Sequence, residues 1–496
     1  MLDRRQRRLA FGLLGVILVT GATLATMSWS EPPRYDGAGY ATLGRALAQG
    51  RGYRVISLPD APRHAHFPPG YPGLLAVVWM VAGTDDVARF TILAHGLSLA
   101  CLAVGVGAIG RWWSSTEPRG VAICLTLDLA WNWTWIRTGG VIRSEPLAIA
   151  LGGLTLLAAR GRSSGSVRGQ VALALLLGVG VLTRQVTACW ALAVAVDLGL
   201  RRGWIRAGRL LAGVAVVVAP WVVWQLAVGS GSQSGLFRPG GMVRLIGEQG
   251  LFYARRIPDA LVGPFVEVAT VFGRSPRLAT VATLAGVAVT GIILLGWVRS
   301  VGSPRRRLGG LVPLTTFPLL LVWPFTEAGR FLIPLVPFLL MGAVEGGAVL
   351  LGRIGVDRPR LWASRLVLAA SLPYSVYAVA TQRSAAERQT QRGFDAACAW
   401  IKTHPEPPGT VMARHPADVA WLTGRLAVAI PEGGPDRIAE VVRVDRVTLL
   451  VVDEERYARS SANPLREFVT DPRQSRKVWD DGATTSVYRV EPTLAP

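Results

Sequence analysis

Long apolar runs that alternate with short arginine-rich connections are the feature that most limits how this chain can fold. A helix needs about 20 residues to cross the hydrocarbon core of a bilayer, which is about 30 Å thick. Eleven runs near that length predict eleven transmembrane helices, at 9–28, 89–110, 120–137, 144–160, 170–183, 185–200, 209–228, 277–298, 310–326, 330–352 and 365–381. A further run, 70–83, has only about 14 residues and starts with Pro-Gly-Tyr-Pro, so we expect it to form a helix in the membrane interface.

The composition agrees with a polytopic membrane protein that also carries some soluble structure. Only 17% of the residues are charged and the mean hydropathy is +0.37, whereas a soluble protein carries about 25% charged residues. The net charge of +21 would suit a nucleic-acid partner. The arginines, however, stand mostly at the ends of apolar runs and not on one amphipathic face, as the positive-inside rule describes. We therefore predict a membrane protein without a nucleic-acid partner.

The charges at the ends of the runs predict their orientation. The first residues, MLDRRQRR, are basic, so we place the N-terminus in the cytoplasm and read 9–28 as a retained helix. The predicted cytoplasmic connections are then all short and basic with few acids, at 111–119, 161–169, 201–208, 299–309 and 353–364. The loop 29–88, the short turn near 137–143, a longer loop near 229–276, the turn 326–330 and the tail after about 382 then fall on the outer side of a plasma (inner) membrane.

Arg184 interrupts the apolar sequence between residues 170 and 200. A single tilted helix would leave this guanidinium group in hydrocarbon, which is costly. We therefore expect a tight hairpin of two short helices, with Arg184 in the turn at the outer surface.

The composition changes near residue 382, where charged and polar residues begin to dominate. Short apolar strands are predicted at Thr410–Ala413, Leu426–Ile430 and Val447–Val452, with helical patterns between them such as Gly393–His404. The chain thus divides into a transmembrane domain, 1–381, and a small α/β domain outside the membrane, 382–496.

The loop 29–88 holds Asp36 a few residues after the first apolar run. Gly37 and Gly39 follow it and allow the backbone to approach a ligand closely. Asp36 is therefore a candidate general base at the outer membrane face. The alternative is an ordinary turn aspartate in Tyr-Asp-Gly.

The rest of this loop carries a helical pattern and a pair of histidines. Tyr40, Leu43 and Leu47 recur at i, i+3 and i+7, which predicts a short amphipathic helix at the outer membrane surface. His64 and His66 could together bind a metal, since neutral imidazole is a common ligand. Surface hydrogen bonding is the alternative reading of this pair.

Five charged residues stand at predicted outer ends of helices: Arg143, Glu145, Arg184, Glu327 and Arg330. Charged side chains at such depths usually face the interior of the helix bundle or a cavity. The guanidinium fork matches phosphate oxygens, so the arginines could hold a lipid-linked phosphate. Plain anchoring in the interface by snorkelling is the alternative.

Taken in order, these features resemble the membrane-embedded GT-C glycosyltransferases, the group that includes protein O-mannosyltransferases and lipid A aminoarabinose transferases. In that family an outer loop with an early acid follows the first helix, and a tyrosine-containing amphipathic helix leads to a His/Pro-rich turn. The corresponding stretches here are YDGAGYATLGRALAQG and HAHFPPGYPGLLAVVW. RSEPLAIALGGL, LTRQVTACWALAVAV and GRFLIPLVPFLL are also similar, and the resemblance covers about residues 9–381.

The resemblance implies a GT-C-like fold and sugar transfer from a polyprenyl-phosphate donor to a hydroxyl of a lipid, glycan or protein acceptor, with inversion. The family's catalytic acid falls on Asp36, which would take the hydroxyl proton. Arg330, Arg184 and Arg143, or a divalent metal ion, would stabilise the departing phosphate. The other expected pocket residues are Tyr40, His66, Glu145 and Glu327.

Two departures from the family pattern bear on a metal cofactor. Many members carry a second acid directly after the catalytic one, and this chain has Gly37 there, which counts against a site of paired acids. His66-Phe67-Pro68-Pro69 resembles the family's His-Pro-Pro turn with one insertion, so His66 is the candidate metal ligand. The residues after 382 match no motif of the family.

Two other classes of function fit some of the same residues. A transporter or flippase for a lipid-linked saccharide would use the outer arginines without a base, although such proteins often show internal repeats, which we do not find in this sequence. A non-catalytic assembly subunit would bind a partner through its outer domain. Sugar transfer is the function that we expect.

Overall fold

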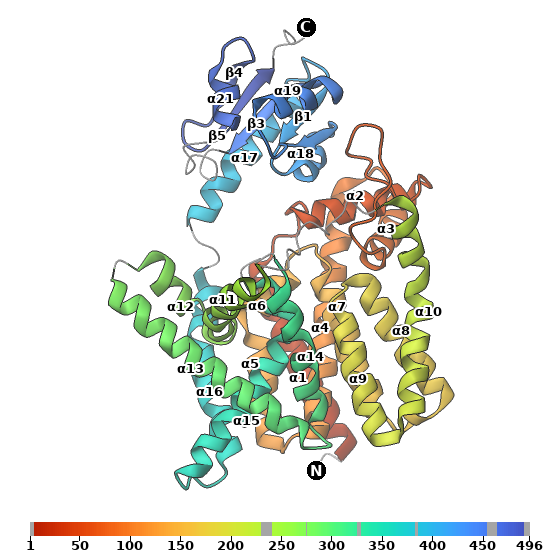
Figure 1. Ribbon diagram of the computed structural model, residues 1–496, viewed down its shortest axis with the longest axis vertical. Coiled ribbons are helices and arrows are strands. Elements are labelled where there is room, and N and C mark those ends of the chain that lie inside the picture. Colours follow the sequence, from red (N-terminus) through yellow and green to blue (C-terminus); the bar gives the residue numbers. More distant parts are fainter. Residues whose placement is uncertain are drawn as a thin grey trace. The chain divides into compact units, whose positions relative to one another are not determined.

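The computed structural model describes residues 4–229, 241–273, 275–324, 329–381, 385–453 and 464–490 (Figure 1). The chain forms two compact units. The first consists of residues 1–28, 68–71 and 95–381, and the second of residues 29–67, 72–94 and 382–496. The polar stretch after the first helix is thus grouped with the C-terminal residues, a grouping that the sequence pattern did not indicate.

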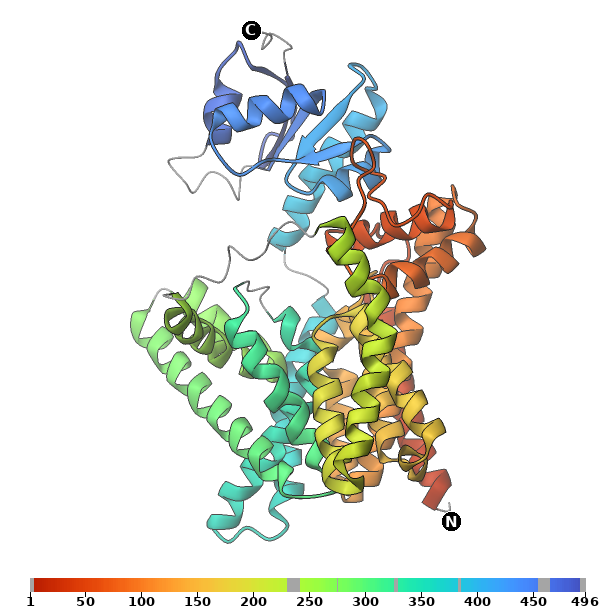
Figure 2. The same ribbon diagram turned by 45° about the vertical axis from the view of Figure 1, so that its right-hand side comes forward.

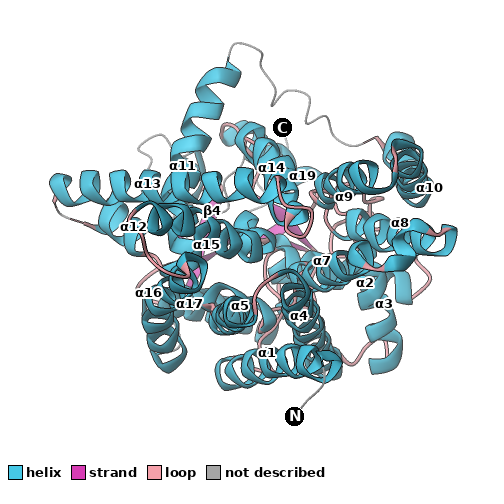
Figure 3. Ribbon diagram, turned by 90° about the horizontal axis from the view of Figure 1, so that it is seen from below, coloured by secondary structure: helices cyan, strands magenta, loops and turns pink. Residues whose placement is uncertain are grey.

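Every regular element described in the first unit is helical (Figure 3). Its helices are α1 (Arg4–Thr26), α4 (Val87–Thr116), α5 (Arg119–Trp131), α6 (Trp133–Gly139), α7 (Glu145–Arg160), η1 (Arg162–Gly165), α8 (Val167–Thr183), α9 (Thr187–Arg202), α10 (Trp204–Val228), α11 (Met242–Val262), α12 (Phe265–Glu267), η4 (Val268–Phe272), α13 (Pro276–Val301), α14 (Arg307–Val322), η5 (Arg330–Leu335), α15 (Val336–Arg353) and α16 (Pro359–Thr381). Residues 87–94 of α4 belong to the second unit. The predicted polytopic helical fold is confirmed.

Five helical segments among the described residues are long and apolar enough to cross a membrane: α4, α10, α13, Arg330–Arg353 and α16. Shorter apolar helices add to these, and the total of eleven spans stays a prediction. Large apolar side chains point away from the packed interior of the unit, as on α10, where Val216 is 74% exposed, and on α13, where Val281 is 62% exposed. Lipid is the solvent that suits such surfaces, and the chain is a multi-pass membrane protein.

The predicted run 120–137 holds two helices because Asn132 separates them. Its backbone is extended, its side chain accepts a hydrogen bond from the Trp135 N–H, and its amide donates to the Ala260 carbonyl at 3.0 Å. Asparagine is a preferred residue at the start of a helix. The break between α5 and α6 therefore follows from helix capping by Asn132, which hydropathy alone does not detect.

The prediction of a loop over 229–276 was wrong for most of its described part, which contains α11, α12 and η4. α11 contains Arg244, Arg255 and Arg256, which lower its mean hydropathy. Gln249, Tyr253, Ile257 and Leu261 recur every four residues and are all buried. This spacing places them on one face of a helix, a signal that was present in the sequence.

The basic connections between the helices meet at one end of the first unit. Arg160 donates to the Arg305 carbonyl at 3.1 Å, and Arg201 donates to the Ala159 carbonyl at 3.0 Å. α8, α9 and α10, which lead into or out of this end, run side by side (Figures 1 and 2). The connections 161–169, 201–208 and 299–309 are therefore neighbours, as a common side of the membrane requires.

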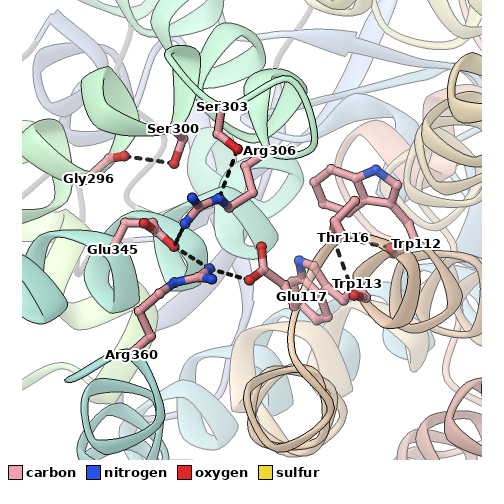
Figure 4. A network of polar contacts seen from close by, with 10 residues as sticks. All are labelled: Trp112, Trp113, Thr116, Glu117, Gly296, Ser300, Ser303, Arg306, Glu345 and Arg360. Carbon is pink, nitrogen blue, oxygen red and sulfur yellow. Dashed lines mark hydrogen bonds and ion pairs between the residues drawn. The ribbon is translucent and has the colours of Figure 1, made fainter. Parts of the chain in front are cut away.

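A buried polar network closes the same end of the unit (Figure 4). Glu345 on α15 accepts from Arg306 at 2.6 Å and also pairs with Arg360 at the start of α16. Arg360 in turn pairs with Glu117, between α4 and α5. Two carboxylates and two guanidinium groups thus join the connections 111–119, 299–309 and 353–364.

The C-terminal part of the second unit is an α/β structure. Its elements are α17 (Ala385–Thr403), β1 (Thr410–Ala413), α18 (Pro416–Thr423), β2 (Ala427–Ala429), α19 (Pro435–Val444), β3 (Val447–Asp453), α21 (Pro464–Thr470), β4 (Ser475–Asp480) and β5 (Thr485–Val490). The strand order is β2-β1-β3-β5-β4, with β2, β1 and β3 parallel and β4 and β5 antiparallel. The three predicted strands are present, and β4 and β5 were not predicted.

Helices cover both faces of this sheet. Buried side chains of α17 and α18 form one cluster with β1 and β3, and those of α19 and α21 form another on the opposite face. All four residues of β1 are buried, as expected for a strand between two helical layers.

The early part of the second unit contains α2 (Asp36–Ala48) and α3 (Gly70–Ala82), except residues 70–71, which belong to the first unit. The predicted amphipathic helix at Tyr40, Leu43 and Leu47 corresponds to α2, and the predicted short helix over 70–83 corresponds to α3. Ser57, between these helices, accepts a hydrogen bond from the Ala427 N–H of the edge strand β2 at 2.9 Å. The early residues thus cover one edge of the sheet.

Candidate active site

A buried carboxylate in the first unit gathers arginines from three separate turns. Glu145 is the first residue of α7 and its side chain is 1% exposed. Arg184, between α8 and α9, pairs with Glu145 Oε1 at 2.7 Å, and Arg330, at the start of η5, pairs with the same oxygen. We call Arg143, Ser144, Glu145, Arg184 and Arg330 the Glu145 cluster.

Neighbouring groups add to the order of this cluster. Arg184 Nη1 also donates to Ser144 Oγ at 3.4 Å, and Arg143 acts electrostatically on the Glu145 carboxylate. A carboxylate at the N-terminus of a helix is favoured by the helix dipole and by the free N–H groups there. The sequence places Glu145 at the first helical position, just before Pro146, and this position fixes where the arginines meet.

Guanidinium groups outnumber carboxylates among the five residues of the Glu145 cluster. Three guanidinium groups and one carboxylate leave a net charge of +2. Arg184 and Arg330 have 13% and 14% of their side chains exposed, whereas Glu145 is almost fully covered. Two guanidinium groups carry ten N–H donors, and one carboxylate has about four lone-pair sites. The arrangement can therefore bind a phosphate through arginines that an internal carboxylate holds in place.

The predicted break into two short helices at Arg184 is confirmed, and its place at the outer surface stays a prediction. α8 ends at Thr183, Arg184 is extended, and α9 begins at Thr187. Gly70, which belongs to the same unit, lies against this turn: a Cβ atom at Gly70 would come 2.7 Å from the Leu182 carbonyl oxygen. Only glycine permits so close a backbone approach.

Asp36 belongs to the second unit, where it is the half-buried first residue of α2. Gly37 donates its N–H to the Arg34 carbonyl at 2.8 Å, and Ala38 donates to the Tyr35 carbonyl at 3.1 Å. We call residues 34–37 the Asp36 turn. Asp36 thus lies where this turn passes into α2.

Aromatic side chains support the loop that follows α2. Tyr40 is buried, and its ring packs against that of Phe67 with centroids 4.6 Å apart. Tyr53 donates its hydroxyl to the Phe67 carbonyl at 2.7 Å, and His64 Nε2 accepts the Phe67 N–H at 2.8 Å. A ring nitrogen that accepts a hydrogen bond carries no proton, so His64 is neutral and its proton is on Nδ1.

Burial, and secondarily the neighbouring His66, lower the pKa of His64 from 6.5 to about 4. A base whose folded pKa is depressed stabilises the fold fully above its unfolded pKa, and this contribution is lost as the pH falls toward the folded value. We expect the full-length protein to melt at a lower temperature at pH 4.5 than at pH 7, with a contribution on the order of 1 kcal/mol from His64 after allowance for solvent screening.

The variant His64→Gln tests this expectation, because its side-chain oxygen can still accept the Phe67 N–H and does not titrate. Its melting temperature should fall less between pH 7 and pH 4.5 than that of the wild type. An equal fall in both proteins would assign the pH dependence to other groups.

The remaining predicted residues fall outside these two groups. His66 is exposed, with its ring 5.1 Å from Phe67 and 6.4 Å from His64. Across the described residues, no group of three or more His, Cys, Asp or Glu side chains is arranged to hold a metal. His66 therefore has no described co-ligands that fit a metal ion. Glu327 lies outside the described residues.

Three residues that sequence reasoning did not single out contact the Asp36 turn. Asp395 on α17 pairs with Arg34, and Asp418 on α18 accepts the Tyr35 N–H at 2.6 Å. The His415 ring meets the Tyr35 ring edge-on at 4.8 Å. Asp395 and Asp418 follow their partners in the turn by 361 and 383 residues along the chain. No local sequence signal points to these contacts.

Compared by sequence, the chain matches no protein family and no curated protein. Solved structures, in contrast, are similar over most of its length. It aligns with the oligosaccharyltransferase of Archaeoglobus fulgidus at a TM-score of 0.55 and 12% identity, over 90% of this chain and 68% of that one. It aligns with ArnT of Cupriavidus metallidurans at a TM-score of 0.52 and 14% identity, over 98% of both chains.

A mycobacterial arabinofuranosyltransferase, AftD, is also similar, at a TM-score of 0.50 and 17% identity, over 99% of this chain and 40% of that one. The chain has a GT-C-like fold. The fold expected from the resemblance is thereby confirmed. Within this GT-C-like fold the Glu145 cluster belongs to the first unit and the Asp36 turn to the second.

Proposed function

We propose that this chain is a membrane glycosyltransferase that moves a sugar from a polyprenyl-phosphate donor to an acceptor hydroxyl at the outer face of the membrane. The acceptor oxygen forms a bond to the anomeric carbon, and the bond from that carbon to the phosphate oxygen breaks with its electron pair. Polyprenyl phosphate leaves, the configuration at the anomeric carbon inverts, and Asp36 takes the hydroxyl proton. The acceptor is a lipid, a glycan or a protein.

The observation that carries this proposal is the Glu145 cluster. A phosphodiester donor carries one negative charge, and the departing phosphate monoester carries up to two. The surplus of +2 in the cluster therefore suits the product side of the reaction better than the ground state. Stabilisation that grows as the charge develops lowers the barrier. Arg184 and Arg330 bind phosphate oxygens, and Glu145 keeps both arginines oriented.

Asp36 is the acid we assign to proton removal. It begins α2 in a segment rich in glycine, and its side chain is half-buried and so remains accessible. A carboxylate can act as a general base when it lies within hydrogen-bond reach of the attacking hydroxyl. A transporter or a non-catalytic assembly subunit would need no such base, and this difference separates the functions by experiment.

The similar structures support the reaction class through their own names. The Archaeoglobus fulgidus oligosaccharyltransferase has also been solved tethered to an acceptor peptide with an NVT sequon, and AftD is an arabinofuranosyltransferase. The meeting of basic connections at one end of the first unit supports a cytoplasmic N-terminus in the plasma membrane by the positive-inside rule. The C-terminal α/β structure is then extracytoplasmic.

Donor binding offers a direct test, with polyprenyl phosphate itself as the probe. Arg330→Ala should weaken its binding to the detergent-solubilised protein by roughly 10- to 100-fold, because a charge-assisted contact is lost. Arg330→Lys keeps the positive charge but lacks the planar guanidinium fork, so its affinity should lie between that of the wild type and that of Arg330→Ala. Arg209→Ala, at an exposed position on α10, is the matched control and should bind as the wild type does. Equal affinities for all four proteins would remove the phosphate site from the proposal.

A further inference from the structure

The Asp36 turn contains a backbone conformation that a side chain rarely adopts. Tyr35 has φ of +53° and ψ of −125°, a region that glycine enters easily and other residues enter at a cost of about 1–3 kcal/mol. Such strain persists only where the surroundings hold it. The chain places tyrosine here although Gly37 stands two positions later, so the contacts of Tyr35 must offset the strain.

Those contacts come from the C-terminal part of the second unit. Asp418, which is 3% exposed, accepts the Tyr35 N–H at 2.6 Å, and the ring of His415 packs on that of Tyr35. Arg34, on the other side of the strained residue, pairs with Asp395 of α17. Two carboxylates therefore hold the two residues that directly precede Asp36.

The element that supplies Asp418 is itself fixed against the early residues. α18 starts with Pro416 and ends at Thr423, where Gly424 caps it in the left-handed conformation, and it packs beside α2 (Figure 1). Trp421, one turn after Asp418, lies 5.8 Å from Trp79 and 5.6 Å from Phe90 between ring centroids. Trp79 and Phe90 stack on each other at 3.9 Å. This aromatic group ties α18 to α3 and α4, and Trp79 Nε1 of α3 donates to the Ala41 carbonyl of α2 at 2.9 Å.

We infer that α17 and α18 position the general base: Asp418 and Asp395 fix the backbone of Arg34 and Tyr35, and thereby the place of the Asp36 carboxylate. This inference rests on the proposed function, because it concerns the base of that reaction. It gives the C-terminal α/β structure a role in the chemical step besides that of a soluble appendage. Neither aspartate needs to touch substrate.

Loss of Asp418 should act on kcat. In Asp418→Ala the Tyr35 N–H loses its acceptor, the strained turn relaxes, and the carboxylate of Asp36 moves from its place at the start of α2. A small displacement of a reacting group lowers the rate of the chemical step more than it lowers the affinity for substrate. We expect kcat for sugar transfer to fall about 10-fold, with KM for the donor and the binding of polyprenyl phosphate unchanged. Asp418→Asn retains an acceptor oxygen and should keep a rate within about 2-fold of the wild type.

The matched control is Asp481→Ala. Asp481 also accepts backbone N–H groups in the C-terminal structure, from Ala483, Thr484 and Thr485 at 2.8–2.9 Å, but it does so in the turn between β4 and β5. Its loss loosens the same α/β structure without touching the Asp36 turn. If the control lowers kcat as much as Asp418→Ala does, general destabilisation explains both results and the inference is overturned.

The assay uses membranes from cells that lack the native chain and are supplied with each variant. A panel of radiolabelled polyprenyl-phosphate sugars is offered, and kinetics are measured with the sugar that the wild type consumes. Arg34→Gln removes the second tie without altering α18, so a fall in kcat there supports the inference even if Asp418→Ala fails to fold. Wild-type kcat in both Asp418→Ala and Arg34→Gln overturns it.

The two proposals fail in different ways. If Asp36→Asn transfers sugar normally, the proposed base is wrong and the positioning role falls with it. If Asp36→Asn is inactive while Asp418→Ala and Arg34→Gln keep full kcat, only the positioning role is wrong.

Discussion

Replacement of Asp36 by asparagine is expected to lower the rate of sugar transfer by about 10²- to 10⁴-fold. Asparagine has nearly the same size as aspartate and still accepts hydrogen bonds, but it cannot take a proton at neutral pH. The helix start at α2 and the pairing of Arg34 with Asp395 do not require the charge of Asp36. The variant should therefore insert into membranes, keep its melting temperature, and bind polyprenyl phosphate as the wild type does.

The measurement is transfer of radiolabel from a polyprenyl-phosphate sugar to endogenous acceptor in membranes that carry the variant. Asp60→Asn is the control, because Asp60 is an exposed aspartate of the same loop with φ of +59°, a conformation that asparagine also adopts. Its rate should match the wild type. Wild-type transfer by Asp36→Asn would leave the transporter or the assembly subunit as the better account of the chain.

Replacement of Glu145 by alanine should be the most destabilising single substitution considered for the first unit. The carboxylate is buried and both Arg184 and Arg330 bind it, so its removal leaves two guanidinium groups without their common partner. Removal of one member of a buried ion pair typically costs about 3–5 kcal/mol. We expect a strong fall in the melting temperature of the solubilised protein, together with loss of polyprenyl phosphate binding.

Glu248→Ala gives the comparison that isolates burial. Glu248 pairs with Arg244 at 2.7 Å on α11, where both side chains are more than half exposed. Solvent screens exposed pairs of this kind, so they contribute little to stability, and the melting temperature should scarcely change. Similar melting temperatures for Glu145→Ala and Glu248→Ala would contradict the central role that we give to the buried carboxylate.

Apolar length predicted most of the described helices of the first unit, because lipid imposes one simple requirement on every span. The turn at Arg184 followed from the cost of a guanidinium group in hydrocarbon. α11 was missed because its arginines lowered the apolar signal, although Tyr253, Ile257 and Leu261 still marked its buried face. Local hydrogen bonding by Asn132 decided the break between α5 and α6, and hydropathy does not detect such caps.

The candidate site was predictable in part. Arginines at the predicted outer ends of helices pointed to a phosphate site, and the structure brings Arg184 and Arg330 to one carboxylate. The part played by Glu145 as the common partner needed three turns to be placed in space. The same holds for Asp418, whose partner in the early loop is 383 residues away in sequence. A single sequence contains no signal that residues so far apart along the chain are in contact.

The polar network of Figure 4 has a consequence for the order in which the chain matures. Arg360 follows its partner Glu117 by 243 residues. At a synthesis rate of about 5–20 residues per second, Glu117 leaves the ribosome about 10–50 s before the guanidinium group that will pair with it. α4 and α5 therefore enter the membrane with this carboxylate still lacking that guanidinium group. Arrival of α16 completes the network, which makes closure of this end of the helices a late event in biogenesis.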